Sequence, residues 1–270
     1  MSFLEKYVME PFRYVTSDWL KVLIGVSLLF LYLIISIIVG AILSILLGSF
    51  SSIFTYMLYL IFEIVLIGYY ISVIKNTLKG LDTLPSWTNL VKIVIDGLLY
   101  KIAYSIALLL YVLVFIAPVI LLGFMLILFF RDLSSHIPWI VLMSLLIIVA
   151  MIVYTVVMYI VFKICASLAT VNFAKKGFFG FFKVLDILKK VSLEYLVIWV
   201  LYKIVPFIIC IIIIIIGGIF LFILLLIPFI NILVILSIII IERVLEFILN
   251  IMFYRAVAKY YREKEEKDKK

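Results

Sequence analysis

Long stretches of this chain carry no charged side chain. Residues 22–62, 102–130, 133–162 and 204–241 contain no Asp, Glu, Lys or Arg. A helix on the surface of a water-soluble domain needs a polar outer face, so such segments do not suit a soluble fold. Apolar stretches that alternate with basic loops are typical of a chain that crosses a lipid bilayer several times. The charge pattern therefore predicts an all-α integral membrane protein.

The composition also indicates that lipid surrounds most side chains. Hydrophobic residues make up 69% of the chain and charged residues 14%, against about 45–50% and about 25% in ordinary soluble domains. The formal charge of +8 fits basic loops that face membrane lipid with anionic headgroups on the cytoplasmic side. The chain has no aromatic RNA-binding motif and no basic recognition helix, so nucleic acid is not an expected partner. Whether a protein partner exists stays open.

Residues suited to catalysis or metal binding are few. Cys165 and Cys210, together with the single histidine, His136, do not supply four ligands for a zinc ion. The sequence has no HExxH, CxxC or phosphate-loop motif, and no Ser-His-Asp set can be assembled from it. We therefore expect no enzyme activity, no catalytic residue, no cofactor and no metal.

The lengths of the apolar stretches predict how often the chain crosses the bilayer. One crossing takes about 20 residues, so 22–62 and 204–241 must each fold back. Helix breakers at 48–52 mark the first turn, Pro118 predicts a kink, and Gly217-Gly218 and Pro228 compete for the last turn. The predicted spans are about 22–47, 53–74, 103–130, 139–162, 193–216 and 220–247, with a polar turn at 131–138.

These spans predict three transmembrane hairpins in a single membrane domain, 1–259, followed by a charged cytoplasmic tail, 260–270. We expect the tail to be a frayed, solvated helix. Of the 23 Lys and Arg, only Arg131 falls in an outer turn, and only Lys203 and Arg243 fall within spans. The positive-inside rule then places both termini in the cytoplasm of a multi-pass cell-membrane protein. The first 21 residues lack the apolar core of a cleavable signal, so we expect an uncleaved anchor.

A basic amphipathic segment precedes each predicted hairpin, which suggests a threefold repeat. Charged and polar residues recur at spacings of three and four in each segment, which puts them on one stripe of a helix. They are Lys6, Glu10 and Arg13; Asn89, Lys92 and Asp96; and Lys183, Asp186 and Lys190. Each segment is expected to be a helix in the cytoplasmic headgroup layer. Such helices either recognise lipid or a partner, or merely connect the hairpins.

A sequence motif follows the second predicted span. Its residues are Gly68, Tyr69, Lys75, Thr77, Leu78, Gly80, Leu84, Pro85, Asp96 and Gly97. This motif resembles the signature of a mainly archaeal, uncharacterised family of multi-pass membrane proteins, domain-of-unknown-function family 4013. Residues 174–177 resemble its second cytoplasmic motif, and the likeness covers roughly residues 1–260. The acidic run that often follows Leu-Pro in the family is absent from 86–90. The resemblance implies an architecture and a membrane location, but no activity.

The motif also has a structural interpretation without any ligand. Gly80 is placed to end a helix, as glycine often does just after the last helical residue. Pro85 keeps the helix from resuming at once. Ser86 or Thr88 is then suited to cap the next helix.

Charged residues within the predicted spans are the candidate functional residues. They are Glu63, Lys203, Glu242, Arg243 and Glu246. A charge at the bilayer centre costs about 2.5–3.5 kcal/mol on insertion scales, so such groups usually face the bundle and find partners. We expect Glu63 to pair with Lys203 or Arg243, or else to stay protonated. Such a group serves either as a proton or cation relay or as a structural ion pair.

Two functional hypotheses follow. The first is a non-enzymatic membrane protein whose basic cytoplasmic face contacts anionic lipid or a partner. The alternative is a small-solute or ion transporter or channel that uses Glu63 and Lys203. A transporter needs a polar cavity that reaches into the membrane, whereas a tightly packed bundle around a directly bonded Glu63 would exclude it.

Overall fold

The described part of the chain is helical throughout its regular structure. The computed structural model describes residues 2–133, 138–223 and 228–268, and no strand occurs among them. The long helices are α2 (Trp19–Leu47), α3 (Ser51–Leu78), α4 (Leu90–Tyr111), α5 (Ala117–Leu133), α6 (Pro138–Lys176), α8 (Leu193–Ile223) and α9 (Pro228–Asp268). The short ones are α1 (Glu10–Thr16), α7 (Val184–Leu188) and the turns η1 (Glu5–Met9), η2 (Gly48–Phe50), η3 (Val112–Ile116) and η4 (Phe178–Phe182).

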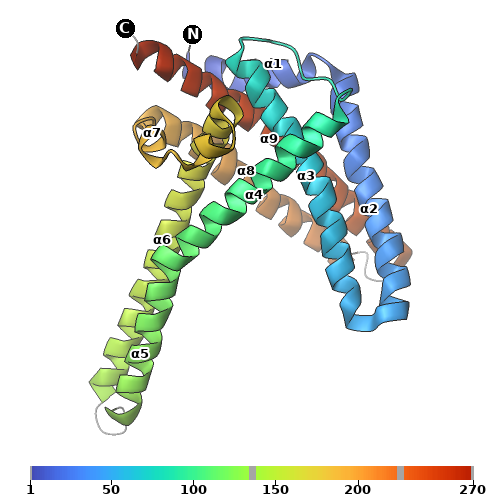
Figure 1. Ribbon diagram of the computed structural model, residues 1–270. Helices are drawn as coiled ribbons and strands as arrows, with labels where there is room; N and C mark the ends of the chain where they lie inside the picture. Colours follow the sequence, from blue (N-terminus) through green and yellow to red (C-terminus); the bar gives the residue numbers. More distant parts are fainter. Residues whose placement is uncertain (1, 134–137, 224–227, 269–270) are drawn as a thin grey trace.

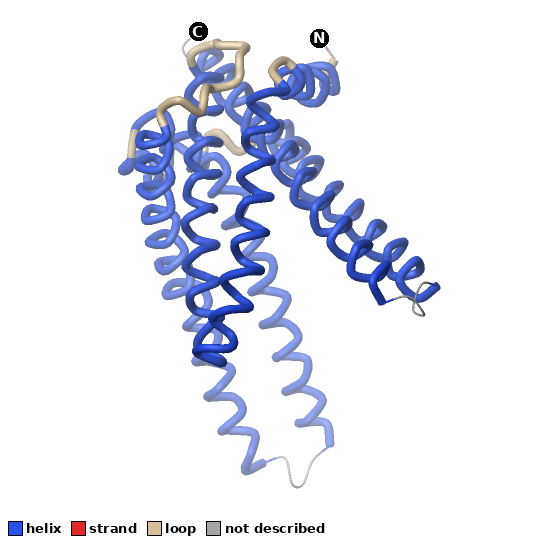
Figure 2. Tube along the Cα trace, turned by 90° about the vertical axis from the view of Figure 1, so that its right-hand side faces the viewer, coloured by secondary structure: helices blue, strands red, loops and turns tan. Residues whose placement is uncertain are grey.

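The long helices pack in pairs: α2 on α3, α5 on α6, and α8 on α9. The pairs meet at the end of the molecule where both chain termini lie, and they diverge toward the opposite end (Figures 1 and 2). We call these two ends the inner end and the outer end. Further contacts of α3 with α4 and of α9 with α1, α2, α3 and α6 join the pairs at the inner end.

The buried core lies at the inner end, and the outer halves of the helices expose apolar side chains. Tyr69, Ile74 and Ile251 are fully buried, whereas Ile45 on α2 is 84% exposed. Among the described residues, four stretches are long and apolar enough to cross a membrane: Trp19–Leu78, Leu90–Met125, Leu145–Lys176 and Leu193–Ile219. The first of these contains both α2 and α3. This distribution of burial and hydropathy agrees with a protein of membrane type.

Proline and glycine act differently along the apolar helices. The expected turn at 48–52 forms, with η2 between α2 and α3. Before Pro118 the helix widens into the π-helical turn η3 and then continues, because proline donates no backbone hydrogen bond. Of the two competing signals for the last turn, Gly217-Gly218 does not end the helix, since α8 continues through it to Ile223 and α9 begins at Pro228. The polar turn predicted at 131–138, with His136, lies mostly outside the described residues.

The expectation of three separate amphipathic helices is only partly met. Residues 6–13 form η1 and the start of α1, and 183–190 contain the five-residue helix α7. Residues 90–96 are instead the first turns of α4, because nothing interrupts the helix before the apolar stretch. Asn89, rather than Ser86 or Thr88, caps α4, and its side chain accepts a hydrogen bond from the backbone of Lys92 at 3.2 Å.

The expectation of a frayed, solvated tail is wrong. Residues 260–268 continue α9, and both Tyr260 and Tyr261 are buried. The acidic side chains beyond them pair with lysines from other parts of the chain: Glu263 with Lys6, Glu265 with Lys175, and Asp268 with Lys190 at 3.9 Å. The alternating charges of the tail therefore fit partners at the inner end.

Candidate functional site

Two glycines allow α3 and α4 to cross in close contact. A Cβ atom added to Gly68 would lie 1.8 Å from the carbonyl oxygen of Ile93, and one added to Gly97 would lie 2.0 Å from that of Ile64. Any side chain at either position would collide with the opposite backbone. The two glycines therefore fix the register of α3 against α4.

The crossing of α3 and α4 brings Lys101 next to Glu63. The side chain of Lys101, one turn beyond Gly97 on α4, reaches the carboxylate of Glu63 with an Nζ–Oε2 distance of 2.6 Å. The expected pairing of Glu63 with Lys203 or Arg243 is therefore wrong. From the sequence we expected Lys101 to lie in a cytoplasmic loop. In the structure α4 begins at Leu90, and Lys101 lies midway along it.

A cavity of about 660 Å³ lies beside this ion pair. All three helix pairs contribute to its lining, through α2, α3, α4, α6, α8 and α9. Its charged lining residues are Glu63, Lys101, Lys163, Lys203, Arg243 and Glu246. The cavity thus brings together four of the five candidate intramembrane residues, while Glu242 is not among its lining residues.

Two lysines in the cavity contact only neutral groups. Lys163 donates to the hydroxyl of Tyr104 at 2.8 Å and lies beside the ring of Tyr159. Lys203 donates to the side-chain oxygen of Asn250 at 3.2 Å, and its ammonium lies 4.3 Å from the centre of the Phe253 ring. Within the described residues, neither lysine has a carboxylate at ion-pair distance.

The other cations of the cavity are paired. Lys101 binds Glu63, and Arg243 donates to Glu246 at 3.0 Å. With every group ionised, the lining carries four positive and two negative charges. The excess positive charge therefore resides on Lys163 and Lys203. Lys163 repels the ammonium of Lys203, but the carboxylate of Glu246 attracts that ammonium more strongly.

Trp199 adds an unsatisfied donor to the lining. Its indole N–H is buried, and it finds no acceptor in the described part of the chain. A buried donor without an acceptor costs about 1–3 kcal/mol. Free donors and unpaired cations in one cavity suit a ligand that supplies oxygen acceptors and negative charge.

The inner end of the cavity is closed by packed aromatic and polar side chains. Tyr100 on α4 and Thr170 on α6 are both buried, and their hydroxyls are 3.0 Å apart. Edge-to-face contacts of Tyr100 with Phe173 and Phe181 extend this layer. Tyr254 and Phe253 on α9 line the same region. Access to the cavity from the inner end is therefore blocked.

The family-like motif forms a clasp above this layer. The α3 helix ends at Leu78, and Gly80 follows with φ +78°, as expected for a glycine at the helix end. Tyr69 stacks on Trp87 at a centroid distance of 3.9 Å, and Leu84 is buried beside them. Lys75 pairs with Asp96 at 2.6 Å. These contacts tie the loop after α3 to α3 itself and join α3 to α4.

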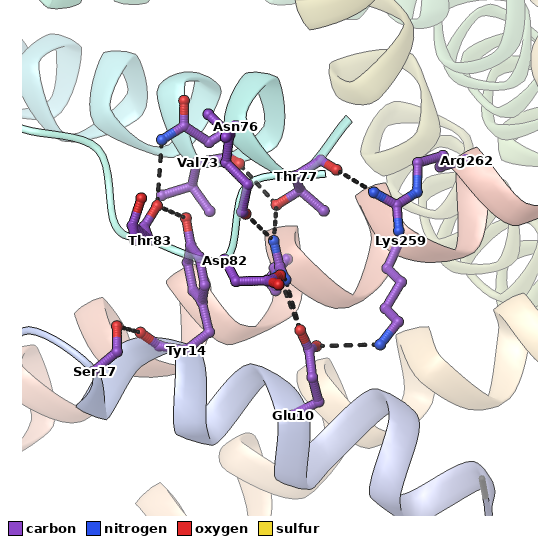
Figure 3. A network of polar contacts seen from close by, with 12 residues as sticks. Glu10, Tyr14, Ser17, Val73, Asn76, Thr77, Asp82, Thr83, Lys259 and Arg262 are labelled. Atoms are coloured by element: carbon purple, nitrogen blue, oxygen red, sulfur yellow. Dashed lines mark hydrogen bonds and ion pairs between the residues drawn. The ribbon is translucent and has the colours of Figure 1, made fainter. Parts of the chain in front are cut away.

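Arg255 on α9 joins the motif to the N-terminal segment. Its guanidinium binds Glu10 at 2.6 Å and Asp82 at 2.5 Å, and it donates to the hydroxyl of Thr77 at 3.2 Å. Burial opposes its charge, but hydrogen bonding and attraction to Glu10 outweigh this and raise the pKa of Arg255. Figure 3 shows Glu10 on α1 facing Asp82 and Lys259, with Thr77 nearby.

Comparison with known sequences places the chain in a family. The family model described as "Protein of unknown function (DUF4013)" matches residues 50–220. The chain belongs to the DUF4013 family. Two uncharacterised proteins of Methanocaldococcus jannaschii are similar to it. MJ1189 is 31% identical over 228 residues, 77% of this chain and 76% of that protein, and MJ0233 is 27% identical over 155 residues. That second match covers 57% of this chain and 52% of MJ0233. No solved structure matches the chain.

The DUF4013 match covers only part of the site. It includes Glu63, Lys101, Lys163 and Lys203, and it ends before Arg243 and the clasp residue Arg255. Sequence reasoning missed Lys101 and Lys163 because both were assigned to cytoplasmic loops. It also missed Arg255, whose only signal was an arginine just beyond the last apolar stretch. No sequence signal marked Trp199 as unsatisfied.

Proposed function

We propose that this DUF4013 protein is a non-enzymatic membrane protein that binds an anionic group within the bilayer. In this proposal α2, α3, α4 with α5, α6, α8 and α9 are six crossings that form three hairpins. Both termini face the cytoplasm of the cell membrane, since Lys6, Lys175 and Lys190 gather around the C-terminal part of α9. The cavity then opens within the bilayer, outside the closed inner layer.

One observation carries this proposal: Lys163 and Lys203 share a cavity and have only neutral partners. An ammonium group at depth in a membrane is unfavourable unless it is paired or hydrated. An anion that binds both groups neutralises the excess positive charge of the cavity and accepts from the free indole N–H of Trp199. Charge-assisted hydrogen bonds of this kind contribute about 1.5–3 kcal/mol each.

The outer surface of the inner end supports a second contact with lipid. Arg13, Lys79, Lys92 and Lys189 are exposed, and the described residues include no ion-pair partner for them. Exposed apolar side chains lie next to them in sequence, such as Leu90 at 51% and Leu188 at 49% exposure. Cations beside apolar groups suit a headgroup layer that contains anionic lipid.

The proposal is tested on the purified protein in a neutral detergent, with inorganic phosphate as the probe. Thermal unfolding is followed against phosphate at constant ionic strength, with chloride as the reference salt. We expect a saturable rise in the melting temperature. Lys163→Gln and Lys203→Gln should each weaken the affinity at least tenfold, because each removes one charge-assisted contact.

Lys267→Gln is the matched control, since Lys267 is an exposed lysine outside the cavity and outside the lipid-contacting surface. It corrects for the general stabilisation that phosphate gives to many proteins by exclusion from their surface. A saturable response that is identical in all three variants and the native protein would refute the cavity as the binding site. The absence of a saturable response in the native protein would refute the function itself.

Transport of a small anion is the second candidate function. The Glu63–Lys101 pair favours it, because the pair lines the cavity and joins α3 to α4 at their crossing. Uptake of radiolabelled phosphate into proteoliposomes tests it. If uptake occurs and Glu63→Gln abolishes it, the result would support transport. Binding of phosphate without any uptake would refute transport and leave only the anion-binding function.

A further inference from the structure

The cavity has two unlike ends. On α9 its lining changes from Asn250 and Tyr254, through Arg243, to Ile239 and Ile240. With a rise of about 1.5 Å per residue, Asn250 and Ile239 are about 16 Å apart along the helix. The polar end therefore adjoins the closed inner layer, and the apolar end points toward the diverging outer halves.

The α2 side of the cavity is mostly apolar. The α2 residues of the lining are Leu29, Phe30, Tyr32, Leu33 and Ser36, of which three are purely apolar and one carries a phenol. Beyond them on α2, Ile37 and Ile45 are 52% and 84% exposed. The apolar end of the cavity thus continues into surfaces that contact lipid chains in a bilayer.

A ligand cannot enter the cavity from the inner end. The layer formed by Tyr100, Thr170 and Phe253 closes the inner end, and fully buried residues such as Ala256 and Val257 lie behind it. The helix pairs diverge on the opposite side (Figures 1 and 2). A ligand that enters from the bilayer, carries a negative charge and has an apolar part is an anionic amphiphile.

We propose, on the basis of the anion-binding function above, that the ligand is a membrane phospholipid. Its phosphate lies between Lys163 and Lys203, and its chains leave the cavity past Leu33 and Ile240, between the diverging helix pairs. The volume of about 660 Å³ falls within the range of about 300–1,000 Å³ that is usual for sites of small organic ligands. It accommodates a headgroup and the first part of the chains.

The charge of the cavity predicts an order of affinity. The lining carries two positive charges in excess when every group is ionised. A phosphate monoester carries about −1.5 to −2 at pH 7, so it matches this excess better than a diester with its single charge. Phosphatidic acid therefore binds more tightly than phosphatidylglycerol, and zwitterionic phosphatidylcholine binds least.

Native mass spectrometry of the detergent-solubilised full chain tests the proposal. The protein is titrated with dioleoyl phosphatidic acid, phosphatidylglycerol and phosphatidylcholine in turn. We expect one phosphatidic acid to bind at least tenfold more tightly than phosphatidylcholine. Lys163→Gln and Lys203→Gln should remove this preference, and Lys203→Arg should keep most of it. Lys267→Gln should not change it, because Lys267 is exposed and lies outside both the cavity and the lipid-contacting surface.

A second pair of variants tests the path of the chains. Leu33→Trp narrows the apolar end without altering a charge, so it should weaken phosphatidic acid binding and leave inorganic phosphate binding intact. Ile38→Trp is its control, because Ile38 is 53% exposed on the same helix and does not line the cavity. Equal loss in both tryptophan variants would overturn the proposed path.

The outcomes separate the two proposals. Saturable binding of inorganic phosphate without selective lipid binding would overturn the lipid assignment and leave the anion-binding function in place. Lipid binding that persists in both lysine-to-glutamine variants would show only lipid on the outer surface, and it would overturn the assignment as well. Failure to bind either probe refutes both proposals.

Discussion

Replacement of Gly68 by alanine probes the contact on which the site depends. The added Cβ would lie 1.8 Å from the carbonyl oxygen of Ile93, whereas close carbon–oxygen contacts between helices are about 3.3–3.6 Å. The helices α3 and α4 must therefore separate by about 1.5 Å or more at the crossing. The obstructing atom belongs to the backbone of a helix, so rotation of a side chain cannot relieve the collision.

Overpacking of this kind costs about 1–3 kcal/mol, and the rigid obstacle places Gly68→Ala at the upper end. At about 2–4 °C per kcal/mol for a chain of this size, we expect the melting temperature to fall by about 6–12 °C. The purified protein in neutral detergent is followed by intrinsic fluorescence on heating. Separation of α3 from α4 should also loosen the Glu63–Lys101 pair and weaken phosphate binding.

Gly218→Ala is the matched control. Gly218 also lies within a long apolar helix, α8, but a Cβ there would meet no atom within 4 Å. Alanine in a helix interior is favoured over glycine by about 0.5–1 kcal/mol, so this variant should melt at the same temperature or slightly higher. If Gly68→Ala melts no lower than Gly218→Ala, the reasoning about the crossing is refuted.

Three further predictions concern the charges. Arg255→Met leaves buried hydrogen-bonding groups at the clasp without their cation and should destabilise the protein by about 2–3 kcal/mol, which thermal unfolding would detect. Glu63→Gln and Lys101→Gln should each lower the melting temperature, and the double variant should recover part of the loss; additive losses would disprove the pairing. The hydrogen bond from Lys176 holds the pKa of Asp186 below its usual 3.8, so the unfolded chain takes up protons first as the pH falls. This contribution to stability is present above about pH 4 and is lost in acid. Asp186→Asn should therefore make the melting temperature depend less on pH in that range.

Local signals were enough to predict much of the fold. The breakers at 48–52 mark a turn because no other residues interrupt that apolar stretch, and η2 lies there. Gly80 ends α3 because glycine adopts the positive φ of +78° without strain. Gly217-Gly218 failed as a turn signal, since glycine is tolerated within a long apolar helix and α8 passes through both.

The candidate site depended on distances that the sequence does not contain. Glu63 was recognised as unusual, but its partner follows from the register of α3 on α4, and that register is set by the contacts of Gly68 and Gly97. The partners of the charged tail could not be predicted from the sequence either. Alternating lysine and glutamate are as common on a solvated helix as on a helix that packs against the protein. Only the structure shows that Lys6 and Lys175 lie close enough to pair with the tail.

The surroundings of two lysines differ in the residue one turn before each. One turn before Lys101 lies Gly97, which lets α3 approach and bring Glu63 within 2.6 Å. One turn before Lys203 lies Trp199, a large residue that lines the cavity and whose indole N–H has no acceptor in the described part of the chain. A small residue in the first case lets two helices close around an ion pair. In the second case the ammonium of Lys203 lines the cavity with no described carboxylate at ion-pair distance, and in our proposal a ligand supplies its counter-charge.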